Sequence, residues 1–600
     1  MTVKDPIETI EQEIIQLLTE LRELLASCST HSVAVWCLLY HMRISHGEAE
    51  KRLTSPAKQI PFLLSVLLST SEPKVPTEFG KPEWERAWPI LERLFFTYMR
   101  LYMPTKEQIG RLPPEWYQVR EVSMSAFLHY FNSGLLASTH QMEERIKTYL
   151  TPFDSEISEF IGISASQALT IFQWIATQLQ DTLDKLGERA HEERKARLNL
   201  LDKAEDQQWS LDTLREAASA SAYRAEIEKL FSEMEKIGIV SLEDLERAFP
   251  KIATIFWEQF SVQRGKAPEI RYPTEQAIYE VRPLARIDEM RAFCPMVNGL
   301  YTALLLVGER ALLQSRYRDK FLMWRDEALE GETLAKIKAF LSPMATIWSK
   351  VYDTPDSQYE HDIIAVDNGL CLIIEAKASP PIEPFRDPDK AFIRLRDAFR
   401  ADRGIQKAFE QGNRVVRKLK AGEAVKLYDK YGREVGTLLT DAYRLPISVC
   451  VTRDNFGPLA TDLSLLLEKD AADSYPWAVN IIDLSSLAEA WSYFKWGPSE
   501  LRKYLEQRIV LHGKVISDDE LDYAGFFIRH SGFDSAIKTQ TDLLQLVPQY
   551  SSIFDELYRH MHLGGPPVTL EQTEPLLMDL KGSIAADEPI FMESGGRVTL

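Results

Sequence analysis

The stretch from Tyr359 to Lys377, YEHDIIAVDNGLCLIIEAK, constrains the fold more than any other part of the 600-residue chain. Residues 359–366 and 370–377 are rich in Ile, Val and Leu, and Asn368-Gly369 lies between them. A type I′ turn needs positive φ at both central residues, so Asn-Gly between two apolar runs is a strong hairpin signal. The sequence therefore predicts two antiparallel strands joined by a two-residue turn.

Charged side chains occupy matching positions on the two predicted strands. With a two-residue turn, Asp362 lies opposite Glu375, and Glu360 lies opposite Lys377 on the same face. Facing carboxylates repel each other. A divalent cation between them would remove the repulsion, because carboxylate oxygens suit Mg²⁺ and Mn²⁺. The alternative is an ordinary buried hairpin in which Glu360 pairs with Lys377 and no metal binds.

A helical pattern precedes this hairpin, and further strands and helices follow it. Its residues Met323, Glu327, Glu330, Leu334, Ile337 and Leu341 recur at three- and four-residue steps, so we expect both glutamates to lie on the apolar face. Alternation of strands with helices predicts an α/β core. The expected elements are a strand at 345–352, a helix containing FEQGNRVV, a hairpin turning at Tyr431-Gly432, and buried strands at 446–452 and 477–483.

The order of these elements, with Asp followed by Glu-Ala-Lys, resembles the PD-(D/E)XK nuclease superfamily. The likeness covers residues 315–510 and is closest to the nuclease-related branch found in uncharacterised bacterial proteins. Within EALEGETLAKIKAFL, Glu330 matches the helix Glu, although the spacing also permits Glu327 or Glu332. In FEQGNRVV, Gln411 matches the supporting Gln of the next helix. The family's Pro before Asp is absent, because Glu360-His361 occupy that place.

The resemblance implies a restriction-endonuclease-like core with a mixed sheet and Mg²⁺-dependent phosphodiester hydrolysis. Asp362, Glu375 and the backbone carbonyl of Ala376 would bind Mg²⁺ or Mn²⁺, and Glu330 would complete the metal shell directly or through a water. Lys377 would position the attacking water and stabilise the developing negative charge. DNA is the expected substrate and RNA the less favoured one. The large helical attachments suit a bacterial defence protein, for example an antiviral one, or a DNA-repair factor.

Residues 386–420 are the best candidate for a phosphate-contacting surface. Eleven basic and five acidic residues give this segment a net charge of 11 − 5 = +6, against −19 for the whole chain. Because an acidic surface repels nucleic acid, binding should be confined to such a local patch. The alternative is a solvated charged face. The candidate nucleic-acid contacts are Arg394, Arg396, Arg400, Arg403, Lys407 and Arg414.

Composition favours a cytoplasmic protein. Five scattered cysteines without a C-x-x-C motif argue against a zinc ribbon or a disulfide framework, and favour a reducing compartment. The first residues, MTVKDPIETIEQE, lack the apolar core of a signal peptide. No apolar run reaches membrane-spanning length, so we expect no membrane partner.

We expect an α+β multidomain protein with three regions. Residues 1–300 have helical periodicity and predict a large all-α region, with a possible division near the mixed-charge segment 185–210. Residues 301–500 would form the nuclease-like α/β domain, and residues 501–600 a helical C-terminal region with a loose tail. The helical N-terminal region offers a surface for a homo-oligomer or a protein partner.

Two other functions remain open. The chain could be a catalytically silent nucleic-acid-binding module that keeps the fold and the basic helix. It could also be a helical scaffold or sensor in which the nuclease-like domain is structural. Metal-dependent activity would distinguish an enzyme from the silent binding module. Affinity for nucleic acid would distinguish both of these from the scaffold or sensor.

Overall fold

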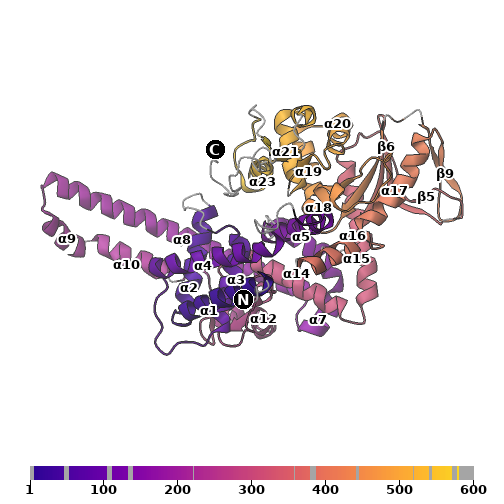
Figure 1. Cartoon of the computed structure of the whole chain (residues 1–600). Coiled ribbons are helices and arrows are strands. Elements are labelled where there is room, and N and C mark those ends of the chain that lie inside the picture. The colour runs from indigo at the N-terminus through magenta and orange to yellow at the C-terminus, as the bar shows by residue number, and fades with distance from the viewer. Residues whose placement is uncertain are drawn as a thin grey trace. The chain divides into compact units, whose positions relative to one another are not determined.

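The computed structural model divides the chain into two compact units (Figure 1). The first contains residues 1–98 and 134–318, and the second contains residues 99–133 and 319–600. The predicted boundaries at residues 300 and 500 do not coincide with this division. The described residues are 6–45, 53–103, 111–132, 139–220, 222–234, 236–356, 358–378, 387–440, 443, 445–517, 519–539, 543–546, 548–570 and 577–579.

The first unit consists mainly of helices, with a small sheet that the helical pattern did not predict. Four short strands pair in the order β1-β4-β3-β2. Two of them, at residues 284–286 and 291–293, lie in the Pro-containing stretch 268–296. The strands are β1 (Ile239–Ser241), β2 (Ser261–Gln263), β3 (Leu284–Arg286) and β4 (Arg291–Phe293). The helices are α1 (Pro6–Ala26), α2 (Thr30–Ser45), α3 (Pro56–Ser69), α4 (Lys81–Met99), α6 (Thr139–Tyr149), α7 (Asp154–Ile161), α8 (Ala165–Asp206), α9 (Leu211–Ala220), α10 (Ala222–Met234), α11 (Leu242–Ala248), α12 (Ala253–Phe260), α13 (Ile278–Val281) and α14 (Asn298–Leu313).

Most of the mixed-charge segment 185–210 belongs to one continuous helix, so the chain does not divide within it. Helix α8 has 42 residues and begins with a capping box, in which the Ser164 side chain accepts from the Gln167 backbone N–H and the Gln167 side chain accepts from the Ser164 N–H. Its far half packs against α10, and the two helices project together from their unit (Figure 1). The charged residues therefore face solvent along an extended helical arm.

The second unit is built on a seven-stranded mixed sheet of order β11-β10-β7-β6-β5-β8-β9. Strand β6 is antiparallel to both of its neighbours, β5 and β7, whereas β7, β10 and β11 run parallel. Both hairpins expected in this region form. The strands are β5 (Thr346–Tyr352), β6 (Glu360–Asp367), β7 (Leu370–Lys377), β8 (Val425–Tyr428), β9 (Glu434–Leu438), β10 (Leu445–Thr452) and β11 (Trp477–Asn480).

Helices cover both faces of this sheet, which explains why β7 is apolar at consecutive positions. Residues Leu370 to Ile374 are all buried, as is usual for a strand with both faces covered. One face packs on α15 (Arg318–Lys338), α19 (Ile481–Phe494), α20 (Pro498–Arg508), α21 (Glu520–His530) and α23 (Ser552–Leu563). The other face packs on α16 (Pro388–Arg400) and α17 (Ile405–Lys420), and α5 (Pro114–Asn132) lies against α16.

The C-terminal residues share the hydrophobic core of the sheet instead of forming a separate region. Leu501, Tyr504 and Phe527 belong to the same buried cluster as Ile374 and Val449. The remaining short elements of this unit are α18 (Pro458–Thr461), α22 (Asp534–Lys538), β12 (Val515–Ile516), β13 (Leu544–Leu546) and β14 (Leu577–Asp579). Most of the expected loose tail, residues 571–576 and 580–600, lies outside the described residues.

The architecture is that of an α+β multidomain protein, as the sequence predicted. None of the helices in the described part of the chain is long and apolar enough to cross a membrane. All five cysteines are buried and free. A smaller difference concerns the predicted strand 477–483, which ends at Asn480 because its side-chain oxygen accepts hydrogen bonds from Ile482 and Asp483 and starts α19.

Candidate active site

The β6–β7 hairpin has the predicted turn and register. Asn368 and Gly369 have φ values of 45° and 81°, as a type I′ turn requires. The ladder runs from the pair Asp367–Leu370 to the pair Ile363–Ile374. The register of the hairpin is therefore fixed locally, by the Asn368-Gly369 turn and the apolar runs on either side of it.

The ladder ends one pair before the two acidic residues. The Ala376 backbone N–H donates to Asp362 Oδ2 at 2.7 Å, so the carboxylate takes the place of a strand carbonyl. The prediction that Asp362 and Glu375 form a regular cross-strand pair is therefore wrong, because the ladder ends at Ile363–Ile374. The two strands part at this point, and the acidic side chains lie where they separate.

The Glu375 carboxylate is fully buried and bound to a histidine that the sequence analysis treated only as a departure from the family pattern. His361 Nδ1 lies 2.8 Å from Glu375 Oε1. Glu375 Oε2 has no hydrogen-bond partner among the described residues, and Lys377 Nζ is 3.9 Å away. The predicted alternative partner of Lys377, Glu360, instead accepts a hydrogen bond from Tyr352. Lys377 therefore belongs to the carboxylate site.

The tautomer of His361 follows from its second partner. Arg414 Nη2 lies 3.4 Å from His361 Nε2, and a guanidinium can only donate. His361 Nε2 must then accept, so the Nδ1–H donates to Glu375. Arg414 also forms a two-bond ion pair with the buried Asp353 at 3.0 Å. We expected Arg414 to contact phosphate. Its side chain instead binds His361 and the Asp353 carboxylate.

The pKa values of two carboxyl groups at this site, Asp362 and Glu330, are raised. Burial, together with the neighbouring Glu375, raises the pKa of Asp362 to about 6, against an ordinary value of 3.8. Burial and then the charge of Asp362 raise the pKa of Glu330. The three carboxyl groups therefore share one region of negative potential, which favours a bound cation.

Helix α15 presents Glu330 to the site but not along the predicted face. Met323 is 63% exposed, and Glu327 is exposed as well. The prediction failed because a competing stripe at four-residue steps, which includes Phe321 and Leu329, offers larger apolar groups to the core. The buried residues of this helix are Phe321, Arg325, Leu329, Thr333 and Ile337. Glu330 lies at the margin of this stripe, half-buried, 3.2 Å from Lys350 Nζ.

Gln411 lies on α17, on the opposite face of the sheet from α15. Its Oε1 atom is buried and has no hydrogen-bond partner among the described residues. The helix approaches β7 and β10 closely because Gly412 leaves room for Ser448, whose hydroxyl would overlap a Cβ there. Gln411 is therefore held near the sheet with an unused acceptor.

The basic stretch 386–420 is largely neutralised, partly by its own acids and partly by acids from other parts of the second unit. Counting acids only within the segment missed Asp326, Asp353 and Glu468, because they are distant in sequence. Arg386 lies outside the described residues, and Arg394 is exposed on α16. The other candidate contacts form the ion pairs Arg396–Asp397, Arg400–Glu468, Arg403–Asp326, Lys407–Glu410 and Arg414–Asp353.

The donor atoms suit a divalent cation, although not through a ready-made cage. Within the described ranges, no group of three His, Cys, Asp or Glu side chains could hold a metal ion. Mg²⁺, however, is commonly bound by only one or two carboxylates, with waters and substrate phosphates completing its octahedron. Asp362 and Glu375 supply two carboxylates, and Glu375 Oε2 accepts no hydrogen bond from the described residues, with Lys377 Nζ at 3.9 Å as its nearby cation. These residues fit the metal ion that the resemblance implies.

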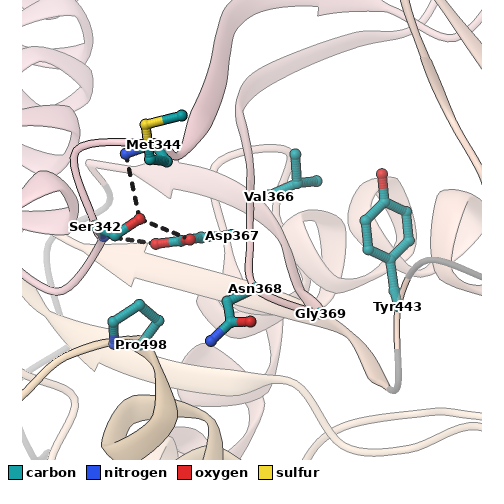
Figure 2. A pocket seen from close by; sticks show the side chains of 8 residues that line it. All are labelled: Ser342, Met344, Val366, Asp367, Asn368, Gly369, Tyr443 and Pro498. Atoms are coloured by element: carbon teal, nitrogen blue, oxygen red, sulfur yellow. Dashed lines mark hydrogen bonds between the residues drawn. The ribbon is translucent and has the colours of Figure 1, made fainter.

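A separate cavity of about 570 Å³ opens beside the hairpin turn (Figure 2). Asp367 accepts hydrogen bonds there from the Ser342 N–H at 2.5 Å and from its hydroxyl at 2.9 Å. Asp367 is five residues along β6 from Asp362, which corresponds to about 17 Å of strand. The cavity therefore lies away from the carboxylates. Its lining residues are Ser342, Met344, Val366, Asp367, Asn368, Gly369, Tyr443 and Pro498.

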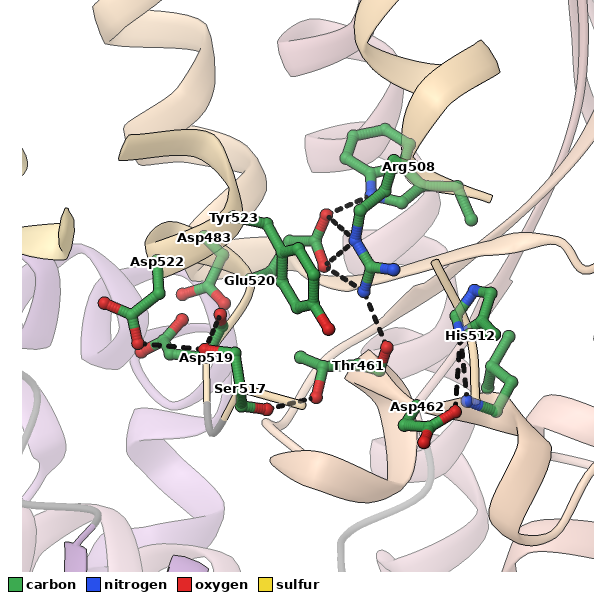
Figure 3. A network of polar contacts seen from close by, with 12 residues as sticks. Thr461, Asp462, Asp483, Arg508, His512, Ser517, Asp519, Glu520, Asp522 and Tyr523 are labelled. Carbon is green, nitrogen blue, oxygen red and sulfur yellow. Dashed lines mark hydrogen bonds and ion pairs between the residues drawn. The ribbon is translucent and has the colours of Figure 1, made fainter. Parts of the chain in front are cut away.

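A second buried polar cluster joins the C-terminal helices (Figure 3). Arg508 donates to both oxygens of Glu520, and Trp477 donates to Glu520 Oε1. Burial and then Asp519 raise the pKa of Asp522 to about 7. Arg508 belongs to α20 and Glu520 to α21, and both side chains are buried, so this ion pair links the two helices.

Comparison of the chain with protein-family models, with curated proteins and with solved structures finds no match. Its function must therefore be inferred from the residues and their geometry.

Proposed function

We propose that this protein is a metal-dependent nuclease that hydrolyses phosphodiester bonds of DNA, or less readily RNA, through a PD-(D/E)XK-type domain in its second unit. The observation that carries the proposal is the meeting of Asp362, Glu375 and Lys377 where β6 and β7 part. The order α15, β5, β6, β7, α17, β10 supports it, because the resemblance implies this order, although α16 precedes α17 and the β8–β9 hairpin precedes β10.

Each residue has a role that its environment supports. When bound by Asp362, Glu375 and the Ala376 carbonyl, a divalent cation would polarise a phosphoryl oxygen and lower the pKa of a bound water. Lys377 is 14% exposed, so its ammonium would act on the water and the developing charge with little screening. His361 fixes the Glu375 carboxylate through Oε1 and leaves Oε2 for the metal.

Glu330 and Gln411 would complete the site from the two covering helices. After burial, the charge of Asp362 is the next cause that raises the pKa of Glu330, so Glu330 would join the metal shell directly or through a water. Gln411 offers an unused carbonyl oxygen from α17. Both side chains thus supply oxygen atoms, the donor type that Mg²⁺ and Mn²⁺ prefer.

The nucleic acid would cross the exposed cations of α16 and α17. Arg400 and Arg403 pair with acids at the surface, where ion pairs are weak, so phosphates can replace those carboxylates. Arg394, Arg396 and Lys407 would add further contacts, whereas Arg414 would act from inside. We propose a cytoplasmic location, which suits five free and buried cysteines. The helical first unit would then serve a partner or a second copy in a defence or repair system.

The test is incubation of the purified full chain with panels of DNA and RNA in Mg²⁺, in Mn²⁺ and in EDTA. We expect cleavage that requires metal and that is lost in Lys377→Met, which keeps the aliphatic stem. Lys426→Ala, an exposed lysine of β8, is the matched control and should cleave like the wild type.

Three outcomes would contradict the proposal in different ways. Nucleic-acid binding without cleavage in any metal would favour the catalytically silent module. Neither binding nor cleavage would favour a helical scaffold or sensor. Cleavage at the wild-type rate by Lys377→Met would remove Lys377 from the reaction.

A further inference from the structure

Lys350 has a backbone conformation that lysine rarely adopts. Its φ is 52°, and it lies inside strand β5. The other non-glycine residues with positive φ in the described part of the chain lie at turns or helix ends, where this conformation is common. Those residues are Asn368 in the hairpin turn, Lys495 and Ser531 at helix C-termini, and Gln208 just after α8.

This conformation changes the face on which the Lys350 side chain lies. The β5–β6 ladder pairs Ser349 with Ile363 and Val351 with His361, and it skips Lys350. Trp348 and Val351 both pack in the cluster on the α17 face, although regular alternation would put them on opposite faces. Lys350 would share the face of Trp348 in a regular strand. The irregularity instead turns it towards α15.

The turned side chain meets the carboxylates of the candidate site. Lys350 Nζ is 3.2 Å from Glu330 Oε2. Lys350 donates to this carboxylate, and lysine is ordinarily an ammonium at neutral pH. Glu330 in turn feels the charge of Asp362. The strained residue Lys350 thus places a positive charge beside the carboxylate of Glu330.

Stability alone does not account for this arrangement. The Lys350 side chain is 56% exposed, and ion pairs at such exposure contribute little. Holding a residue with a Cβ in the left-handed region costs at least as much as such a pair returns. Strain of this kind persists where a side chain is needed at one position, which is most often a functional site.

We propose that Lys350 binds a non-bridging oxygen of the substrate phosphodiester, as a second cation of the site besides Lys377. The inference rests on the proposed nuclease function and adds a substrate contact that no motif marks. Lys377 is largely buried beside Glu375, whereas Lys350 is open to solvent and can meet an incoming polyanion. Its charge offsets the repulsion between the phosphate and the carboxylates of Glu330 and Asp362.

Replacement by glycine separates the functional role from a structural one. Lys350→Gly removes the charge and also relieves the strained φ, so the variant should melt no lower than the wild type, and up to about 2–4 °C higher. Lys495→Gly is the matched control, because Lys495 is an exposed lysine at φ 56° that caps α19. Lys350→Arg keeps the charge and tests rescue.

The assays use the full chain with a labelled DNA duplex. We expect Lys350→Gly to lower kcat/KM in Mn²⁺ at least tenfold. In Ca²⁺, the slope of log affinity against log salt should become shallower by about one, as loss of one phosphate contact requires. Lys495→Gly should stay within twofold of the wild type in both assays, and Lys350→Arg should recover most of the loss.

The possible failures are distinguishable. If the wild type cleaves but Lys350→Gly matches Lys495→Gly in rate and salt slope, Lys350 does not contact the phosphate and this inference alone is wrong. If Lys350→Gly melts several degrees lower, its pairing with Glu330 is structural and the inference is also wrong. If the wild type neither binds nor cleaves nucleic acid, the proposed function falls, and this inference falls with it.

Discussion

Replacing Asp362 by asparagine should stabilise the metal-free protein, which is the opposite of what removal of a buried side chain usually does. The pKa of Asp362 rises from 3.8 to about 6 in the fold, because the group is buried and close to Glu375. A rise of about two pH units corresponds to about 2 × 1.36, or ~3 kcal/mol. Asp362 is partly exposed, so solvent screening lowers the expected gain to about 1–2 kcal/mol. The asparagine oxygen can still accept the bond from the Ala376 N–H.

The dependence on pH gives the effect a signature. Between the unfolded pKa near 4 and the folded pKa near 6, the folded state holds the Asp362 proton more tightly, so wild-type stability falls as pH rises through this window. Well above the folded pKa, the wild type has lost all of the stability that the Asp362 proton contributes. The variant should therefore exceed the wild type by its full margin at pH 8, by about half of that at pH 5, and by nothing below pH 4.

The assay is urea unfolding in EDTA, followed by tryptophan fluorescence, on the transition that responds to added Mn²⁺. Asp367→Asn is the matched control, because Asp367 lies on the same strand and both its oxygens accept hydrogen bonds from Ser342. That variant should lose about 1–2 kcal/mol. If Asp362→Asn also loses stability at pH 8 in EDTA, the bond to Ala376 dominates and the hairpin is an ordinary ion-paired ribbon.

Three further predictions concern other charges of the second unit. Reversing Arg394, Arg400 and Arg403 to Glu should weaken nucleic-acid binding equally for all sequences and reduce its salt dependence, as anisotropy titrations would show; unchanged binding would place the contact surface elsewhere. Asp353→Asn should lower unfolding free energy by about 2–3 kcal/mol, because it leaves Arg414 without its carboxylate, and a urea melt equal to that of the wild type would contradict this. Arg508→Met should cost about 3–5 kcal/mol by stranding its buried partner, whereas a neutral effect in the same melt would show that the pair contributes nothing.

The parts of the fold that could be predicted from the sequence are those fixed by local chemistry. The hairpin register follows from the Asn368-Gly369 turn and the apolar runs beside it. The strand before the hairpin and the strand at 446–452 followed from the same kind of local pattern.

The remaining features depend on contacts between distant segments. His361 became important only when α17 brought Arg414 against it, and its single sequence signal was its place beside Asp362. The face of Lys350 was unpredictable because alternation assumes a regular strand, and positive φ in a lysine leaves no mark in the sequence. The net charge of residues 386–420 overstated how positive this surface is, because acids such as Asp326 and Glu468 reach it from other elements.

Titration of Mn²⁺ into the metal-free full chain tests the central claim most directly, because it needs no knowledge of the substrate. We expect one calorimetric binding event at the β6–β7 site, lost in Asp362→Asn and in Glu375→Gln and retained in Asp367→Asn. A wild type that binds no Mn²⁺, or variants of Asp362 and Glu375 that bind it as tightly as the wild type does, would contradict the assignment of these carboxylates to a metal site.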